Sequence, residues 1–251
     1  MVSLMTNEIH PTAIIGETVV LGENVQIGAY SLVDGETVIG SNSVIGSHCH
    51  LGNKSSLSKD NRLLIGENSL IRSHSVIYSG SRFGSNFVTG HRVTVRENTI
   101  AGENLQVGTL CDIQGHCNLG NFVRFHSNVH IGQGSDIGDF VWIFPYVVLT
   151  NDPHPPSNEL IGCTIGNYAA IATMSVILPG VEVGRGALVG ASTLVRSDVP
   201  EDTICVGNPG KNVGSTEKIT LKGSGEPAYP WRRHFHRGYP DYIVSKWKSE
   251  F

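Results

Sequence analysis

The chain has 251 residues, of which 39% are hydrophobic, 16% are charged and 7% are aromatic, and it contains 30 glycines. The net charge of −4 argues against a nucleic-acid-binding protein, which needs a basic surface to hold phosphates, while the hydrophobic share is large enough to build a core. The sequence shows no signal-peptide pattern and no run of about 18 apolar residues, so it predicts a soluble, cytoplasmic protein without membrane insertion.

An aliphatic residue recurs at every sixth position through most of the chain. The period begins at Ile15, shifts by two residues within 55–64, continues to Leu149, and resumes from Ile165 to Val195. Of the 28 six-residue units, or hexads, 24 begin with Ile, Leu or Val. An α-helix has a period of about 3.6 and a simple strand a period of about 2. The period of six therefore predicts a β-solenoid, in which each hexad is a short strand followed by a corner.

Three hexads make one triangular coil, so the sequence predicts about nine coils. Residues 18 apart would then stack above one another at about 4.8 Å. The first residue of each hexad points inward and a small fifth residue fills the corner, while glycine and asparagine supply the backbone conformations of the corners. Cys49, Cys111 and Cys117 occupy fifth positions. We therefore interpret them as buried, reduced thiols, since no cysteine spacing resembles a zinc or redox motif.

The repeat is interrupted at Leu149–Pro156, where the sequence reads LTNDPHPP. A polar, proline-rich excursion from a regular scaffold predicts a functional loop, because loops on rigid scaffolds carry many binding and catalytic sites. We assign residues 1–211 to the solenoid domain, with the loop at 150–164. Residues 212–251 form a linker and a capping or interaction tail.

The tail has two interpretations. Asp241 can begin a short helix that buries Ile243, Val244 and Trp247, and such a tail could dock as a cap or as a subunit contact. The alternative is that the tail binds a phosphate or a nucleotide base through basic side chains interleaved with aromatic ones. The residues concerned are Arg232, Arg233, His234, His236 and Arg237, with Trp231 and Phe235.

The hexads, together with RSDVPEDTICVGNPGK after Val195, resemble the hexapeptide-repeat acyltransferases. This resemblance implies an all-β fold, a left-handed parallel β-helix with a short, partly helical C-terminal extension. Over 75–211, VWIFPYVVLTNDPHPP and IGNYAAIATMSVILPGVEVGRGALVGASTLV are similar to nucleotide-sugar N-acetyltransferases, including those acting on dTDP-linked 3-amino-3,6-dideoxyhexoses. The resemblance implies acetyl-CoA as co-substrate, a dTDP- or UDP-linked amino sugar as acceptor, no metal, a homotrimer and a role in lipopolysaccharide or related glycan biosynthesis.

The resemblance also implies that Asn151 holds the amino group of the sugar. An amide oxygen can accept a hydrogen bond from the amine without protonating it, so Asn151 would orient the amine rather than act as a base. The proton would leave to the departing thiolate or to a histidine, and His154 and His130 are the candidates. Asp152, next to Asn151, is a further candidate for substrate binding.

Other candidate substrate contacts come from neighbouring coils. His91, Arg92 and Arg96 would reach the diphosphate and base, since His91 lies about three coils, or roughly 14 Å, before Asn151. Glu97 and Gln133 share the column of Asn151, and Gly115 in that column would leave room for the ligand. For the donor, the resemblance implies that pantetheine approaches small residues after the loop and that a lysine faces its phosphates. These residues are Ala172, Gly190, Ala191 and Lys211.

Four alternatives remain at this point. A sugar O-acetyltransferase would use His154, which precedes a proline, as its base. A γ-carbonic-anhydrase-like metalloenzyme would need three convergent histidines, and the spacings of His91, His126 and His130 fit that pattern poorly. A lipid A type acyltransferase shares only the opening IHPTAII, and a non-catalytic solenoid leaves the polar loop unexplained.

Overall fold

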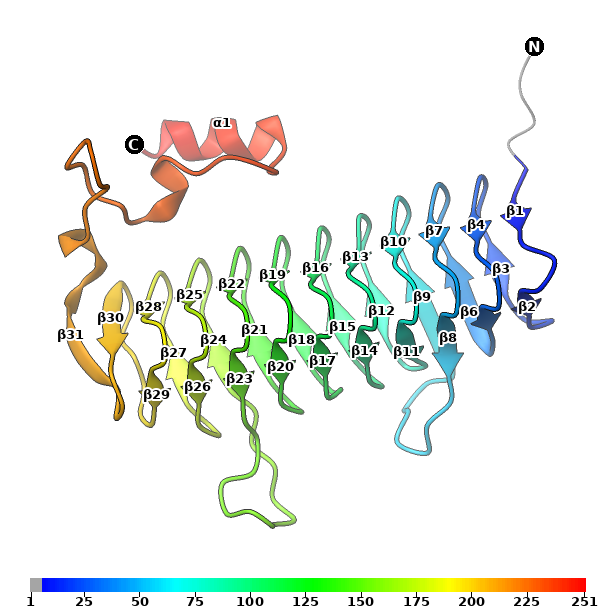
Figure 1. The fold of residues 1–251 in the computed structure, drawn as a ribbon, viewed down its shortest axis with the longest axis horizontal. Helices are drawn as coiled ribbons and strands as arrows, with labels where there is room; N and C mark the ends of the chain where they lie inside the picture. Colours follow the sequence, from blue (N-terminus) through cyan, green and yellow to red (C-terminus); the bar gives the residue numbers. More distant parts are fainter. Residues whose placement is uncertain (1–5) are drawn as a thin grey trace.

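The computed structural model describes residues 6–251 and shows a long three-sided prism made of parallel strands (Figure 1). Each side of the prism is one sheet, and we call these sheets face 1, face 2 and face 3. From β1 to β29, successive strands along the chain belong to successive faces, so each coil contributes one short strand to every face. The architecture is all-β and matches the left-handed parallel β-helix.

Face 1 holds twelve strands in the order β1 (Glu8–Ile9), β4 (Gln26–Ile27), β7 (Val44–Ile45), β10 (Leu70–Ile71), β13 (Val88–Thr89), β16 (Gln106–Val107), β19 (Arg124–Phe125), β22 (Trp142–Ile143), β25 (Ala170–Ile171), β28 (Leu188–Val189), β30 (Thr203–Val206) and β31 (Lys211–Ser215). Only β31 pairs antiparallel with its neighbour.

Face 2 holds ten strands, β2 (Ile14–Ile15), β5 (Leu32–Val33), β8 (His50–Asn53), β11 (Val76–Tyr78), β14 (Thr94–Val95), β17 (Asp112–Ile113), β20 (His130–Ile131), β23 (Val148–Leu149), β26 (Val176–Ile177) and β29 (Leu194–Val195). Face 3 holds nine strands, β3 (Val20–Leu21), β6 (Glu36–Ile39), β9 (Arg62–Ile65), β12 (Arg82–Phe83), β15 (Ile100–Ala101), β18 (Asn118–Leu119), β21 (Asp136–Ile137), β24 (Thr164–Ile165) and β27 (Glu182–Val183).

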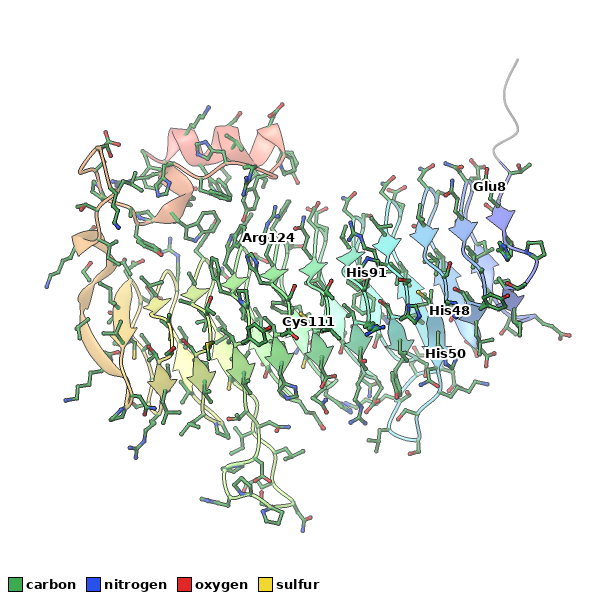
Figure 2. The ribbon with its side chains drawn as sticks, viewed as in Figure 1. Glu8, His48, His50, His91, Cys111 and Arg124 are labelled. Carbon is green, nitrogen blue, oxygen red and sulfur yellow. The ribbon has the colours of Figure 1, made fainter. Side chains whose placement is uncertain are left out.

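The predicted use of each hexad is confirmed by the burial pattern. In most strands the second residue is the one that begins the hexad, and it is buried, whereas the residue before it faces outward. In β10, for example, Ile71 is fully buried and Leu70 is partly exposed. Fifth-position residues are also buried, and these include Cys49, Cys111 and Cys117. Cys111 lies inside the solenoid in Figure 2, and desolvation by burial raises its pKa to about 11, as expected for an unreactive thiol.

The solenoid is longer than the nine predicted coils. The repeat that starts at Ile15 omits β1, which already pairs with β4, and the repeat that ends at Val195 omits β30, which pairs with β28. β1 keeps the period, because Ile9 lies six residues before Ile15, whereas β30 departs from it, because Cys205 pairs with Val189 across 16 positions instead of 18. Counting hexads alone therefore underestimated the length of face 1.

Two loops interrupt the coils, and both leave the solenoid at the edge between face 2 and face 3 (Figure 1). The first joins β8 to β9, where Ile39 pairs with Ile65, 26 positions later instead of 18. It therefore inserts eight residues rather than the two that the shift of the repeat suggested. The second joins β23 to β24, where Ile137 pairs with Ile165 across 28 positions. This loop contains the LTNDPHPP interruption.

The glycines serve mainly the close approach of adjacent coils. A Cβ atom at Gly40 would lie 2.4 Å from the backbone nitrogen of Glu67, and one at Gly90 would lie 2.3 Å from that of Thr109. Such distances are shorter than a van der Waals contact allows. The left-handed corner conformations instead fall largely on other residues, with asparagine the most frequent, as at Asn24 and Asn42. Glycine at the second hexad position is thus required by packing rather than by φ.

The C-terminal tail folds back alongside the solenoid instead of covering its open end (Figure 1). It contains two short 3₁₀ helices, η1 (Thr216–Lys218) and η2 (Trp231–Arg233), and one α-helix, α1 (Asp241–Ser249). The predicted helix from Asp241 is confirmed, and Trp247 is its buried residue. Residues from the tail and the solenoid form a second apolar cluster, whose buried members are Phe122, Trp231, Tyr239 and Trp247. Within residues 6–251 no helix is long and apolar enough to span a bilayer.

Replacing Trp247 tests whether this cluster holds the tail. Trp247 is 1% exposed, and removing a buried tryptophan side chain costs about 3–5 kcal/mol. We expect Trp247→Ala to release the tail, so that limited proteolysis cuts within 212–240 while the solenoid stays intact. Tyr242→Ala, on the exposed side of the same helix, is the matched control and should leave the tail protected. Equal protection in both variants would contradict this packing.

Candidate active site

The outer surface of face 2 carries His130, which the sequence analysis proposed, and Asp112, which it did not propose. His130 begins β20 and Asp112 begins β17, and the two residues are direct partners in the parallel register. The Nδ1 atom of His130 lies 3.2 Å from Oδ2 of Asp112, and both side chains are more than one third exposed. When Nδ1–H of the neutral ring donates a hydrogen bond to the carboxylate, Nε2 is left as the free acceptor.

Asp112 is held as a carboxylate by its neighbours. Burial alone would raise its pKa, but hydrogen bonds from His130 and from the side-chain amide of Gln114 outweigh that effect and lower it. The Gln114 amide nitrogen lies 2.5 Å from the same Oδ2 atom. Asp112 can therefore orient the imidazole of His130 and stabilise its protonated form, as a carboxylate does in a catalytic histidine–carboxylate pair.

Arg96 and Glu97 lie one coil below Asp112. Nη2 of Arg96 donates to Oε1 of Glu97 at 2.8 Å, and the side chain of Glu97 is only 1% exposed. The predicted direct contact of Glu97 with substrate is therefore not available in this conformation, because the carboxylate is buried. Its effect on face 2 is to fix the guanidinium of Arg96, which is 31% exposed.

The column from Glu97 to Asn151 lies at the edge between face 2 and face 3. We expected Gly115 to leave room for a ligand, but the backbone of the neighbouring coil fills that space. A Cβ atom on Gly115 would lie 2.6 Å from the carbonyl oxygen of Glu97. Its φ of +89° is a second reason for glycine. Gln133, one coil further, is partly exposed and makes no side-chain hydrogen bond within residues 6–251, so it is free to meet a ligand.

Asn151 stands at the base of the second loop. Its carbonyl oxygen accepts a hydrogen bond from the backbone N–H of Ile161 at 2.8 Å, which closes the loop. A Cβ on Gly132 would lie 2.7 Å from the carbonyl oxygen of Leu149 and 3.1 Å from Cβ of Asn151, so glycine is required there by the close approach of the coils of His130 and Asn151. The predicted orienting amide and the candidate base thus lie in adjacent coils of the solenoid.

Asp152 and His154 are organised by the loop itself. Asp152 accepts hydrogen bonds from the backbone N–H of His154 at 3.0 Å and from both the backbone N–H and the hydroxyl of Ser157. Burial would raise the pKa of Asp152, but the hydrogen bonds from Ser157 and His154 lower it. Its oxygens are occupied within the loop, which projects away from the prism (Figure 1). His154 is exposed on this loop and has no side-chain hydrogen bond within the described chain.

His91 and Arg92 lie at the opposite edge of face 2, in the coil of Arg96. Both side chains are exposed, and Nδ1 of His91 lies 2.8 Å from the hydroxyl of Ser73 in the preceding coil (Figure 2). Arg92 adopts a left-handed φ of 56° at the corner. The predicted diphosphate contacts therefore do not form one cluster, but they border a single polar face.

The predicted donor residues lie elsewhere, around face 1 and its last coils. Ala172 follows β25 and Gly190 follows β28, with Ala191 at the adjoining corner. A Cβ on Gly190 would lie 2.6 Å from Cγ1 of Val206, so that glycine is required by packing. Lys211 begins β31, where it is exposed opposite Val206. Ala172, Gly190 and Ala191 thus lie at the same edge, between face 1 and face 2, as His91 and Arg92, whereas Asn151 lies at the other edge of face 2.

Within residues 6–251, no three His, Cys, Asp or Glu side chains lie close enough together to hold a metal ion. The sequence could have identified Asp112, because it precedes His130 by 18 positions and residues at that spacing stack wherever no loop intervenes. No comparable signal existed for the burial of Glu97.

Comparisons with known proteins agree with this fold. Residues 18–53 match the family model "Bacterial transferase hexapeptide (six repeats)". The chain is 32% identical over 110 residues to galactoside O-acetyltransferase of Escherichia coli (strain K12), covering 35% of this chain and 54% of that protein. It is 36% identical over 98 residues to serine acetyltransferase of Bacillus pumilus (strain SAFR-032), covering 37% and 42%. The chain thus spans about half the length of these curated relatives.

Among solved structures, Arabidopsis UDP-N-acetylglucosamine acyltransferase aligns with a TM-score of 0.53 and 16% identity, covering 82% of this chain and 74% of the other. At that identity the likeness concerns the fold alone. The chain is therefore a left-handed parallel β-helix protein, and its residues 18–53 match the bacterial transferase hexapeptide repeat.

The His130–Asp112 contact can be tested by titration. In His130→Ala we expect the pKa of Asp112 to rise, because one of the hydrogen bonds that lower it is lost, and carboxyl carbon NMR would measure the change. Since the folded-state pKa is the lower one, the stability contributed by this pair is complete above about pH 4 and is lost as pH falls through the folded-state pKa. Asp152 serves as the internal control, and an unchanged Asp112 pKa would contradict the contact.

Proposed function

We propose that the protein transfers the acetyl group of acetyl-CoA to the amino group of a dTDP- or UDP-linked amino deoxysugar used in cell-surface glycan synthesis. The observation that carries the proposal is the His130–Asp112 pair on an open polar face, one coil from Asn151. The acetyltransferase names of the curated relatives support the same reaction class. The proposed location is the cytoplasm, where acetyl-CoA and sugar nucleotides would both be available.

In the proposed reaction the amine attacks the thioester carbonyl. The new C–N bond forms, the C–S bond breaks, and the nitrogen must lose one proton. Asn151 accepts a hydrogen bond from the amine and so directs its lone pair at the carbonyl carbon. Nε2 of His130 accepts the proton, Asp112 stabilises the resulting cation, and the proton then passes to the departing thiolate.

The rest of face 2 would position the acceptor. Arg96, fixed by Glu97, offers positive charge for a diphosphate, and Gln133 offers an unoccupied amide. His91 and Arg92 border the same surface and would meet the nucleotide end of a long substrate. Asp152 supports this site by shaping the loop next to Asn151.

The donor would approach the small residues Ala172, Gly190 and Ala191 on and beside face 1, with Lys211 near its phosphates. Because Asn151 and these residues lie at opposite edges of face 2, the complete site would form between copies of the chain. A closed homotrimer of three-sided prisms meets this need, since it places the same pair of surfaces together three times. This assembly is part of the proposal.

A second candidate is transfer of the acetyl group to a sugar hydroxyl. The similarity to galactoside O-acetyltransferase favours it, and a hydroxyl needs a base more than an amine does. In this alternative His154, or His130 with Asp112, would remove the hydroxyl proton during attack.

The proposed reaction is tested with acetyl-CoA and a panel of dTDP- and UDP-linked amino sugars and their hydroxyl analogues, with release of free thiol as the readout. We expect turnover of at least one amino sugar, and a loss of about tenfold or more in kcat/KM for Asn151→Ala, the size of one lost hydrogen bond of about 1.5 kcal/mol. Turnover of hydroxyl analogues alone would select O-acetylation. No turnover of any acceptor, or full activity of the variant, would reject the proposal.

His154 separates the two chemistries. We expect His154→Ala to reduce kcat by less than about tenfold, because its ring lies on the projecting loop and only its backbone is bonded to Asp152. A loss of several thousand-fold in kcat is the size expected when a general base is removed. Such a loss would favour O-acetylation with His154 as the base.

A further inference from the structure

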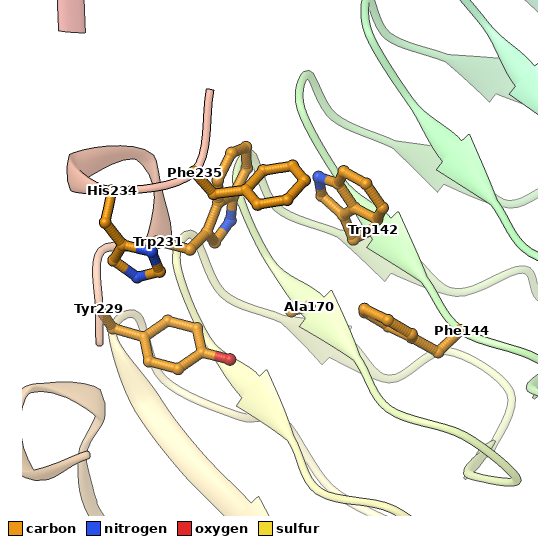
Figure 3. Close-up of a pocket in the computed structure, with 7 residues that line it drawn as sticks. All are labelled: Trp142, Phe144, Ala170, Tyr229, Trp231, His234 and Phe235. Carbon is orange, nitrogen blue, oxygen red and sulfur yellow. The ribbon is translucent and has the colours of Figure 1, made fainter. Parts of the chain in front are cut away.

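A small apolar cavity lies where the C-terminal tail meets face 1 (Figure 3). Its volume is about 180 Å³. The lining side chains are almost all aromatic, with one small residue: Trp142, Phe144, Ala170, Tyr229, Trp231, His234 and Phe235. The cavity is partly open to solvent, so a ligand can enter it.

The solenoid provides the floor of the cavity. Ala170 points outward from β25, between Trp142 of the preceding coil and Leu188 of the following one. These larger neighbours in the same register leave a notch above Ala170. Phe144 borders the notch on the side of face 2. The cavity therefore depends on a single small residue within a row of large ones.

The tail provides the other walls, and specific hydrogen bonds fix them. The indole nitrogen of Trp231 donates to the carbonyl oxygen of Tyr168 at 3.0 Å, and that of Trp142 donates to the hydroxyl of Tyr239 at 2.9 Å. Arg124 also donates to the carbonyl oxygen of Gly238 at 2.7 Å (Figure 2). The aromatic walls are thus preorganised, which reduces the entropy cost of ordering them around a ligand.

Aromatic rings line the cavity on two sides. Figure 3 shows Trp142, Trp231 and Phe235 on one side of the cavity and Phe144 and Tyr229 on the other. The hydroxyl of Tyr229 points towards the cavity and has no hydrogen-bond partner within residues 6–251. An apolar space gives water few partners, whereas one ring could stack on these walls and bond to this hydroxyl. Pockets for whole drug-sized ligands measure about 300–1,000 Å³, so this one accepts a single ring system.

Positive charge lies beside the cavity. The guanidinium of Arg237 sits 5.8 Å from the ring of Phe235, is exposed, and forms no ion pair within the described chain. Arg232 is instead engaged by Glu250 at 2.9 Å. A ring that carries phosphate groups would therefore find an unoccupied guanidinium next to its binding pocket.

We infer that this cavity binds the planar base of a nucleotide, with the phosphates directed towards Arg237. The inference rests on the proposed function for the source of the base, which is either the adenine of CoA or the pyrimidine of the sugar nucleotide. It gives the tail a role in ligand binding in addition to packing.

The protein contains three tryptophans, and all three belong to this aromatic cluster. Binding in the cavity should therefore quench intrinsic fluorescence directly. We expect saturable quenching of the full-length protein by adenosine and CoA if the source is the donor, or by thymidine and dTDP, or uridine and UDP, if it is the acceptor. Absence of saturable quenching by all of these compounds would overturn the inference.

Two variants locate the binding. Ala170→Leu fills the notch with a side chain that the same column already accepts as Leu70 and Leu188, and we expect it to weaken binding at least tenfold. Val88→Leu adds bulk to that column four coils earlier and should change nothing. If proteolysis shows that Ala170→Leu releases the tail, Tyr229→Phe becomes the deciding variant. We expect it to weaken ligand affinity by about threefold or more. Unchanged affinity in the deciding variant would overturn the inference.

Turnover separates this inference from the proposed function. With both correct, Ala170→Leu raises KM for the nucleotide that quenches, with little change in kcat. Turnover with an unchanged KM in that variant would overturn the cavity as a base-binding site and leave the acetyl transfer standing. Quenching that depends on Ala170 without turnover of any acceptor would support the cavity and reject the proposed reaction.

Discussion

The parallel pairing of successive coils is the constraint on which the rest of the structure depends. Backbone hydrogen bonds hold each residue over its counterpart 18 positions away, wherever no loop intervenes. Inward positions then form continuous aliphatic columns, and glycines such as Gly40 allow the coils to approach closely. A change at one position therefore acts on a column of neighbours, so the repeat must stay regular throughout its length.

The same register builds the outward-facing surfaces. It places His130 over Asp112 on face 2, and it places Ala170 between two large side chains on face 1. In both cases the proposed ligand contacts come from ordinary strand positions rather than from a special local fold. Loops modify these surfaces at one edge, where Asn151 leaves the regular coil, and the tail modifies them on the side of Arg124.

Much of the fold could be predicted from the sequence because the period of six is local and repeated many times. The helix beginning at Asp241 and the buried cysteines were also predictable, because the sequence signal for each lies within a few residues. The docking of the tail on face 1 was not, because aromatic contacts between residues such as Trp231 and Tyr168 join distant segments without any period. The burial of Glu97 depends on its pairing with Arg96, which spacing alone does not reveal.

The central claim is that the coil register makes His130 and Asp112 one functional unit in acetyl transfer. A double-mutant cycle in kcat/KM, with His130→Ala, Asp112→Asn and the double variant, tests it most directly. If the two residues act together, the double variant should be no more impaired than His130→Ala alone. Losses that simply multiply would show that the residues act independently, and wild-type rates in both single variants would contradict the account of the site.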